Sequence, residues 1–400
     1  METSSRLTIS FNTSYPEHYF EERIAQPVHK KFPWVKLIYK NEEPFFNNNI
    51  ERWRSTDTSP DILLMSSPTF VIPNFIQNNF QYDLNDLNSQ NQCDLSQFDP
   101  GSLEQILCFG KRGHVYALPY DRTEHPLFYN KQIFDKFGVS YPQDGMNWEE
   151  TIEIAKKVTG EIDGIFYRGL DIADFALLLY QLSLTYLDPV TDYAIVNNEH
   201  WKLVAETMKD IYTIQGNLPD PKQLFRFNGG FIRDKNVAMA VICANCLTEP
   251  EIDWDIVTYP TFKQFPMIKP TAPNSNFLII SPFSKNKQKA FEIISYLVSQ
   301  EHQLYNSKHG NVSSLKNSVI NEAYASELPH FKDKNIKALF INKSAKPVID
   351  KSIFEYEVIG FVKDAFRKMI LENRDVSTTL QELELIINNA VVKLKDKLHA

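Results

Sequence analysis

The 400-residue sequence contains few glycines and none of the short motifs that carry common catalytic chemistry. Only 13 residues are glycine, and no phosphate-binding loop of the GxxxxGK[ST] type is present. Neither the GxSxG turn of a serine hydrolase nor the HExxH pair of a zinc protease occurs. These absences argue against a P-loop enzyme, an α/β-hydrolase and a zinc protease. The paired acids of a glycosidase are a spatial feature, so a glycan-active enzyme stays open.

The sequence also lacks a long hydrophobic run and an excess of positive charge. No apolar stretch reaches the roughly 18 residues of a membrane-spanning helix. The first six residues contain neither the basic nor the apolar region of an export signal. We therefore consider a cytosolic protein or a mature segment whose export signal has been removed. Lys and Arg number 42 against 50 Asp and Glu, a net charge of −8. Because no Lys/Arg cluster is present, nucleic-acid binding is not expected.

Cysteine is scarce as well, with Cys93, Cys108, Cys243 and Cys246. The last two have CxxC spacing, but they follow the apolar run 238–242, whereas a redox pair is expected at the start of a helix. A zinc site would need two further ligands, and no second CxxC or neighbouring His pair supplies them. We interpret the four as buried or half-buried thiols with incidental pairing, and a disulfide within either pair stays open for an exported protein. No metal and no other cofactor is predicted.

The chain does carry alternating strand and helix patterns. Residues 7–11 alternate apolar and polar side chains as a strand does, and residues 17–31 have helical apolar spacing. The continuous apolar run 61–65 is typical of a strand covered on both faces. Asn147 and Glu150 have the spacing of a capping box at a helix start. Further strands are predicted at 35–39, 115–119, 164–167, 238–242, 256–259 and 277–280, and further helices at 172–187 and 199–215. Strands separated by helices indicate parallel βαβ units, and the length allows two α/β domains.

Four blocks of sequence, in order, resemble one known family. Residues 110–119 (GKRGHVYALP) resemble the Gly-Lys-x-Tyr-Gly-Leu-Pro segment of bacterial extracellular solute-binding proteins of family 1, the maltose-binding type that serves ABC transporters. Residues 127–139 (LFYNKQIFDKFGV) resemble the family's Leu-x-Tyr-Asn-Lys-x-x-Phe-x-x-x-Gly-Val run, and NWEE follows at 147–150. Residues 227–239 resemble its Phe-x-x-Gly-x-Ala-Met element, and residues 278–290 its late strand and Ser-Lys-Asn-Lys-x-x-Ala helix.

The resemblance implies an α/β periplasmic-binding-protein fold of type II, with two lobes joined by hinge strands and a ligand cleft between them. It implies discontinuous lobes, with residues 1–118 and 270–312 in lobe 1, residues 119–269 in lobe 2, and C-terminal helices in 313–400 that pack mostly on lobe 2. The hinge would lie near residues 118–120 and 260–273. The family often has Gly-Gly where this chain has residues 273–276, so the resemblance leaves the identity of the ligand open.

Candidate ligand-binding residues follow from the rule that ligands bind beyond the carboxyl ends of strands in parallel α/β sheets. Sugar hydroxyls need fixed donors and acceptors, and aromatic rings cover the C–H faces of a sugar. Each candidate also has a structural interpretation as a turn, cap or solvated residue, and no catalytic residue is predicted. The candidates are Ser14, Tyr15, Glu42, Glu43, Ser66, Ser67, Tyr120, Asp121, Arg122, Arg168, Phe227, Asn245, Asn274 and Asn276.

The resemblance implies a substrate-binding protein of an ABC importer, which binds a small solute by hinged closure of its lobes. We expect the solute to be a mono- or oligosaccharide. The partners would be this ligand and a membrane permease, and the protein itself would be a monomer that binds no nucleic acid. It would act at the extracellular face of the membrane or in the periplasm, lipid-anchored through its precursor. Three alternatives are a ligand-sensing domain of a regulatory or signalling protein, a binder of a non-sugar solute, and a glycan-active enzyme.

Overall fold

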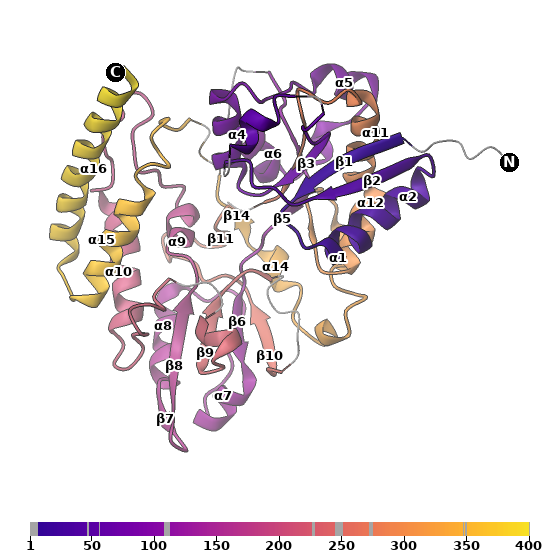
Figure 1. Cartoon of the computed structure of the whole chain (residues 1–400). Helices are drawn as coiled ribbons and strands as arrows, with labels where there is room; N and C mark the ends of the chain where they lie inside the picture. Colours follow the sequence, from indigo (N-terminus) through magenta and orange to yellow (C-terminus); the bar gives the residue numbers. More distant parts are fainter. Residues whose placement is uncertain are drawn as a thin grey trace. The chain divides into compact units, whose positions relative to one another are not determined.

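The computed structural model describes residues 7–45, 48–55, 57–107, 113–225, 229–244, 251–271, 275–346, 348 and 350–399, with the backbone alone for Thr69 and residues 397–399. Its internal contacts divide the chain into two compact units (Figure 1). Unit 1 comprises Met1–Thr123 and Ala272–Pro329, and unit 2 comprises Glu124–Thr271 and His330–Ala400. The chain therefore passes between the units three times.

Unit 1 is built on a five-stranded sheet in the order β2-β1-β3-β12-β4. Its strands are β1 (Leu7–Thr13), β2 (Val35–Lys40), β3 (Ile62–Met65), β4 (Leu118–Pro119) and β12 (Phe277–Ile280). β1 is parallel to β2 and β3, whereas β12 is antiparallel to β3 and β4. A short pair of strands, β5 (Asp121–Arg122) and β13 (Val312–Ser313), is also antiparallel. The helices are α1 (Glu17–Phe20), α2 (Gln26–Lys31), α3 (Asn49–Arg52), α4 (Pro68–Gln77), α5 (Asn85–Gln90), α6 (Pro100–Leu107), α11 (Lys287–Leu297), α12 (Gln300–Lys308) and α13 (Ser318–Glu322).

The sheet of unit 1 is buried on both faces, as the apolar run 61–65 predicts. Ile62 and Leu64 of β3 belong to one apolar cluster, and Leu63 and Met65 belong to another. Successive side chains of a strand point to opposite faces, so one continuous apolar run supplies both clusters. The helices that supply the rest of these clusters include α2 and α11 on one side and α4 on the other.

Unit 2 has a second five-stranded sheet, in the order β10-β6-β9-β8-β7. Its strands are β6 (Leu127–Asn130), β7 (Gly160–Ile162), β8 (Ile165–Ile172), β9 (Val237–Val241) and β10 (Trp254–Val257). β8 and β9 are parallel, and β6 is antiparallel to β9 and β10. β11 (Ile268–Lys269) and β14 (Lys343–Ser344) form a parallel pair. The helices are α7 (Lys131–Phe137), α8 (Trp148–Lys157), α9 (Ala176–Gln181), α10 (Glu199–Thr213), α14 (Ala338–Ile341), α15 (Ile359–Leu371) and α16 (Val376–His399).

Local signals place α8 where the sequence predicts it, whereas only Ala176–Gln181 of the predicted helix 172–187 is helical, as α9. Asn147 caps α8, and the Asn147 and Glu150 side chains each accept a backbone N–H of the other residue, which confirms the predicted capping box. α7 ends at Gly138, which adopts a left-handed conformation with φ 63° that glycine tolerates best. α15 and α16 bury Phe366, Leu383 and Ile387 in the core of unit 2.

The unit boundaries differ from the predicted lobe boundaries by two residues before Ala272 and by more at two other places. Residues 119–123 belong to unit 1, because β4 pairs with β12 and β5 pairs with β13. Residues 313–329 also belong to unit 1, so only the C-terminal part from His330 onward joins unit 2. The prediction drew both boundaries too early because short strands such as β5 and β13 carry almost no periodicity.

Candidate functional site

The carboxyl ends of the unit 1 strands meet at one edge of the sheet. Thr13 of β1 lies opposite Leu64 of β3, and Phe277 of β12 pairs with both Met65 of β3 and Pro119 of β4. The segments that follow β1, β2, β3 and β4 therefore share this edge with the segment that precedes the antiparallel β12. We call it the unit 1 edge, and it carries the predicted residues Ser14, Tyr15, Glu42, Glu43, Ser66, Ser67, Tyr120, Asp121 and Asn276.

Three of these predicted residues, Tyr15, Asp121 and Asn276, are joined by hydrogen bonds. The Tyr15 hydroxyl donates to Asp121 Oδ2 at 3.1 Å, and the Asn276 amide Nδ2 donates to Asp121 Oδ1 at 2.7 Å and to the Tyr15 hydroxyl at 2.8 Å. The Tyr15 ring stacks on Tyr19, with 4.1 Å between ring centroids. Burial raises the pKa of Asp121, and the donated hydrogen bonds offset only part of this rise.

Tyr120 and Arg122 have hydrogen-bond partners within unit 1, and a role of either residue at a ligand stays a prediction. Tyr120 has no exposed surface, and its hydroxyl accepts a hydrogen bond from Asn306 Nδ2 at 2.7 Å. Arg122 donates to the Ser313 carbonyl at 2.8 Å and to the Asp99 carboxylate at 3.2 Å. The pairing of β5 with β13 holds this segment within unit 1.

The other predicted residues of the unit 1 edge differ in exposure. The Glu42 carboxylate accepts from Trp53 Nε1 at 2.8 Å and pairs with Arg52 at 2.8 Å. Burial would raise the pKa of Glu42, but these two partners outweigh it and lower the pKa. Glu43 and Ser14 are exposed, and Ser66 and Ser67 are partly buried at the start of α4. A role of these residues at a ligand stays a prediction.

In unit 2, the prediction that a strand ends at Arg168 is wrong. β8 continues to Ile172, so Arg168 lies inside the strand. Its guanidinium donates to Asp171 at 2.7 Å and to the Asn217 carbonyl at 3.4 Å, and only 10% of its side chain is exposed. Arg168 is therefore part of a buried polar cluster of unit 2 rather than of a strand end.

The true strand ends define a second polar edge. Leu127 of β6 pairs with Val241 of β9 and with Val257 of β10, and Ile172 of β8 also pairs with Val241. The segments after β8, β9 and β10 thus share an edge with the segment before the antiparallel β6. We call it the unit 2 edge. It carries Glu124, His125, Asp174, Ala244 and Tyr259.

Sequence reasoning missed these unit 2 residues, and burial dominates their electrostatics. Burial raises the pKa of Asp174, whose carboxylate accepts the Ala176 N–H at 2.9 Å. Glu124 forms a buried ion pair with Lys269, which also donates to the Leu339 carbonyl at 2.7 Å. Burial and the charge of Lys269 lower the pKa of His125 to about 4, so its imidazole is neutral at pH 7. The signal that could have identified this edge in the sequence is the polar residues that follow the true end of β8.

Three predicted site residues, Phe227, Asn245 and Asn274, lie outside the described residues. Cys243, next to Ala244 at the unit 2 edge, is disulfide-bonded and buried. Cys93 is a free thiol, and burial raises its pKa to about 11.

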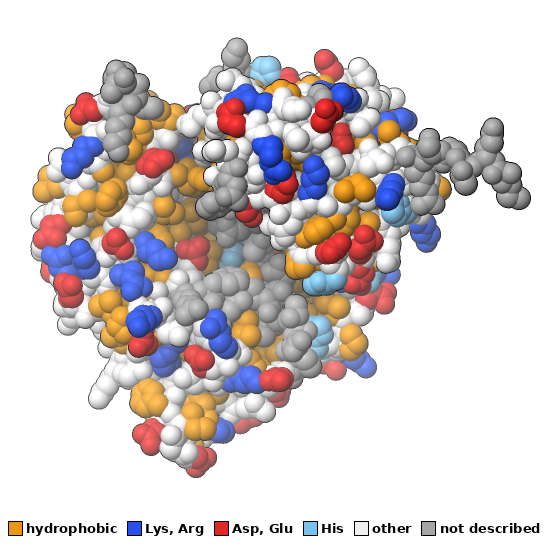
Figure 2. All heavy atoms as spheres, viewed as in Figure 1, with side chains coloured by type: hydrophobic (Ala, Val, Ile, Leu, Met, Phe, Trp, Pro, Cys, Tyr) orange, Lys and Arg blue, Asp and Glu red, His pale blue; other side chains and the backbone are white. Residues whose placement is uncertain are grey.

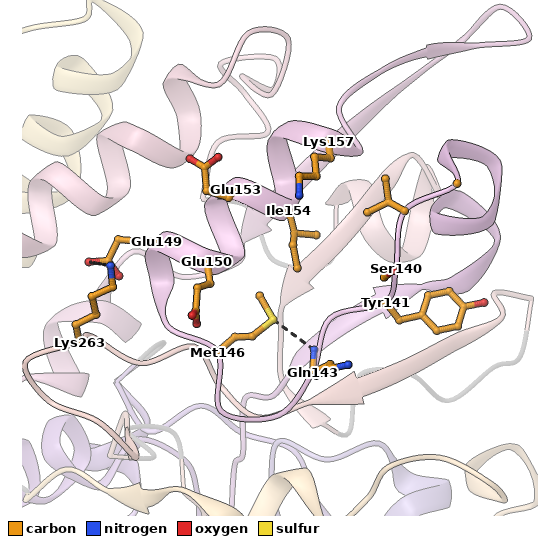
Figure 3. A pocket seen from close by; sticks show the side chains of 12 residues that line it. Ser140, Tyr141, Gln143, Met146, Glu149, Glu150, Glu153, Ile154, Lys157 and Lys263 are labelled. Carbon is orange, nitrogen blue, oxygen red and sulfur yellow. Dashed lines mark hydrogen bonds and ion pairs between the residues drawn. The ribbon is translucent and has the colours of Figure 1, made fainter.

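A pocket of about 730 Å³ lies on unit 2, between α8 and the loop that follows α7 (Figure 3). Acidic and basic side chains both line it, and Glu149 lies 4.0 Å from Lys263 across it. None of the predicted site residues contributes to this pocket. It also shares no residue with the unit 2 edge.

Two further properties of the described part of the chain bear on function. Within it, no three His, Cys, Asp or Glu side chains are grouped so that they could hold a metal ion. No described helix has both the length and the apolar composition needed to cross a membrane. On the face shown in Figure 2, basic and acidic side chains are interspersed rather than gathered by sign.

Solved structures with the same fold define the class of protein. An ABC substrate-binding protein from Listeria monocytogenes in complex with cycloalternan has a TM-score of 0.74 at 16% identity, over 96% of this chain and 99% of that one. The sugar-binding protein MalE from Xanthomonas citri has a TM-score of 0.74 at 15% identity, over 98% of this chain and 99% of that one. These similarities confirm the predicted fold class, that of the periplasmic-type solute-binding proteins.

Sequence comparison then gives the family. The model of the family described as bacterial extracellular solute-binding protein matches residues 48–333, and the chain belongs to this family. The melibiose/raffinose/stachyose-binding protein of Bacillus subtilis is 30% identical over 100 residues, which is 25% of this chain and 22% of that protein. This match thus spans less than a quarter of the relative's length.

Proposed function

We propose that this protein is the substrate-binding component of an ABC importer and that its ligand is a mono- or oligosaccharide. The observation that carries the proposal is the family match over residues 48–333. In this proposal the two lobes close on the ligand by a hinge motion. The protein is a monomer, and its partner is a membrane permease. The place of action would be the extracellular face of the membrane or the periplasm, with a lipid anchor in the precursor.

Two kinds of observation favour a carbohydrate ligand. Solved structures with the same fold include proteins with a bound sugar. The Listeria monocytogenes protein is in complex with cycloalternan, and T. maritima MalE3 is bound to maltose. The unit 1 edge also offers the kinds of group that a sugar requires, because the partly buried residues Tyr15 and Asn276 bring an aromatic ring and an amide to it. Such a combination of an aromatic ring and fixed polar groups suits a molecule with C–H faces and hydroxyls.

A thermal-shift screen tests the proposal. The panel contains raffinose, stachyose, maltose, mannotriose and tagatose, with amino acids, polyamines and organic acids as controls. A ligand that binds only the folded protein stabilises it by about 2.7 kcal/mol at a hundredfold excess over its Kd. We expect a rise in Tm with one class of sugar. A rise with a control alone would discard carbohydrate and keep a solute receptor.

Absence of any shift across the panel would instead favour the sensor alternative. The glycan-active alternative is tested by incubating the protein with the sugar that binds and by chromatography of the products. We expect the sugar to be recovered intact. Light scattering on the same sample measures the mass, for which we expect the value of a 46.4 kDa monomer.

A further inference from the structure

Asp121 is a buried carboxylate whose capacity to accept hydrogen bonds is filled. Only 5% of the residue is exposed. Its Oδ1 accepts from the Asn276 backbone N–H at 3.1 Å and from Asn276 Nδ2 at 2.7 Å. Its Oδ2 accepts from the Tyr15 hydroxyl at 3.1 Å and from Asn311 Nδ2 at 3.2 Å. An ionised carboxyl group has about four lone-pair sites, so four donors leave Asp121 no acceptor for a ligand.

The same contacts fix the side-chain amide of Asn276. A carboxylate only accepts hydrogen bonds, so the nitrogen of the amide must face Asp121. Its two hydrogens go to Asp121 and to the Tyr15 hydroxyl, at 2.7 Å and 2.8 Å. The amide oxygen Oδ1 of Asn276 accepts no hydrogen bond from the described residues, and the residue is partly exposed. An acceptor is therefore held at the unit 1 edge before any ligand arrives.

We propose that Asp121 is a positioning residue that does not touch the ligand, and that Asn276 Oδ1 accepts a hydrogen bond from a ligand hydroxyl. This inference rests on the proposed function, because it concerns the same ligand. It narrows the ligand to a neutral polyhydroxyl compound. An anion such as a sugar phosphate would be disfavoured for two reasons. Its acceptor oxygens would face the acceptor Asn276 Oδ1, and its negative charge would lie near the buried carboxylate of Asp121.

A matched control exists in the same unit. Asp61 is also a buried carboxylate with four donors, namely Ser10 through its backbone and its hydroxyl, Ser284 and Asn286. However, Asp61 precedes β3, whereas the unit 1 edge follows it, so Asp61 lies at the opposite end of the strand. Asp61→Asn and Asp121→Asn should both lower Tm, because each replaces an acceptor by a donor that faces donors.

Only Asp121→Asn should change the binding of ligand. Calorimetric titration uses the neutral sugar of the panel above that binds the wild type, with glucose 6-phosphate as the anionic probe. We expect Asp121→Asn to raise the Kd for the sugar by about tenfold or more, as for loss of a charge-assisted hydrogen bond. Asp61→Asn should leave this Kd within about twofold of the wild-type value. Equal Kd values for the two variants, or tighter binding of glucose 6-phosphate than of any neutral sugar, would overturn the inference.

A second measurement needs no ligand. Protein labelled with ¹⁵N-asparagine gives the hydrogen-exchange rates of the Asn276 side-chain amide, assigned by its loss in Asn276→Leu. We expect slow exchange in the wild type and in Asp61→Asn, and fast exchange in Asp121→Asn. Fast exchange in the wild type would disprove the positioning role. If the wild type binds no sugar while this exchange pattern holds, the proposed carbohydrate function fails and the positioning role of Asp121 survives.

Discussion

The unit 1 edge and the unit 2 edge satisfy their buried polar groups in opposite ways. Asp121 in unit 1 accepts four hydrogen bonds from neutral donors. In unit 2, Tyr259 is buried, and its hydroxyl has no partner among the described residues. Among the described residues, Glu355, which is also in unit 2, accepts the backbone N–H groups of Tyr186 and Leu187, at 2.9 Å and 3.1 Å.

This difference indicates two roles for buried polar side chains. A filled hydrogen-bond network fixes side chains in one arrangement, which suits a surface that must present defined groups. Buried groups with few partners instead keep more of their desolvation cost, which at Glu355 appears as a raised pKa. The two edges should therefore respond differently to the same kinds of substitution.

The largest effect is expected at the ion pair Glu124–Lys269 of the unit 2 edge, whose side chains are 5% and 8% exposed. Lys269→Met leaves the Glu124 carboxylate buried without its cation. We expect the free energy of unfolding in urea to fall by about 3–5 kcal/mol. The double variant Glu124→Gln/Lys269→Met should recover most of this loss, because it removes both charges.

The exposed pair Lys285–Asp57 provides the control, with side chains 67% and 85% exposed. Lys285→Met should change the free energy of unfolding by less than about 0.5 kcal/mol, because solvent screens the pair. A loss below about 1 kcal/mol for Lys269→Met would mean that water reaches Glu124, and the two edges would then be alike in this respect.

A smaller, pH-dependent effect is expected at Glu355, which is 3% exposed. Burial raises its pKa from 4.5 to about 7. Because the folded-state pKa is the higher one, the folded state favours the protonated carboxyl. This contribution to stability is full below pH 4.5 and is lost as the pH rises to about 7. Relative to Glu355→Gln, the wild type should lose about 3 kcal/mol across this interval, at 1.36 kcal/mol per pKa unit.

Urea unfolding at several pH values between 4 and 8 measures this difference. Glu322→Gln, at an exposed site of α13 in unit 1, should run parallel to the wild type at every pH. If the free energy of unfolding of Glu355→Gln also changes with pH in parallel with that of the wild type, the carboxyl of Glu355 is solvated in the folded protein. Glu355 would then not carry the desolvation cost that its burial implies.

The two edges also differ in how far the sequence could predict them. β12 was predicted at 277–280 with its observed bounds, and the residues after β1, β2 and β3 were placed at the correct edge, because apolar runs end sharply there. In unit 2, Arg168 and Asp171 pair within β8. Two charged residues inside a strand look like its end, so Asp174 was missed. A sequence also does not show which way a ring points, and Tyr120 is therefore a core residue that was predicted as a ligand contact.

The smallest effect, and the most direct comparison of the edges, comes from removing one hydroxyl in each unit. Tyr15→Phe removes a donor to Asp121 and an acceptor of Asn276, so we expect a loss of about 1–3 kcal/mol in the free energy of unfolding. Tyr259→Phe removes a buried hydroxyl without a described partner, so stability should stay the same or rise by about 1 kcal/mol. Both variants are compared by urea unfolding at pH 7. Equal losses would show that Tyr259 also has a hydrogen-bond partner, such as a bound water, and that the unit 2 edge is as well satisfied as the unit 1 edge.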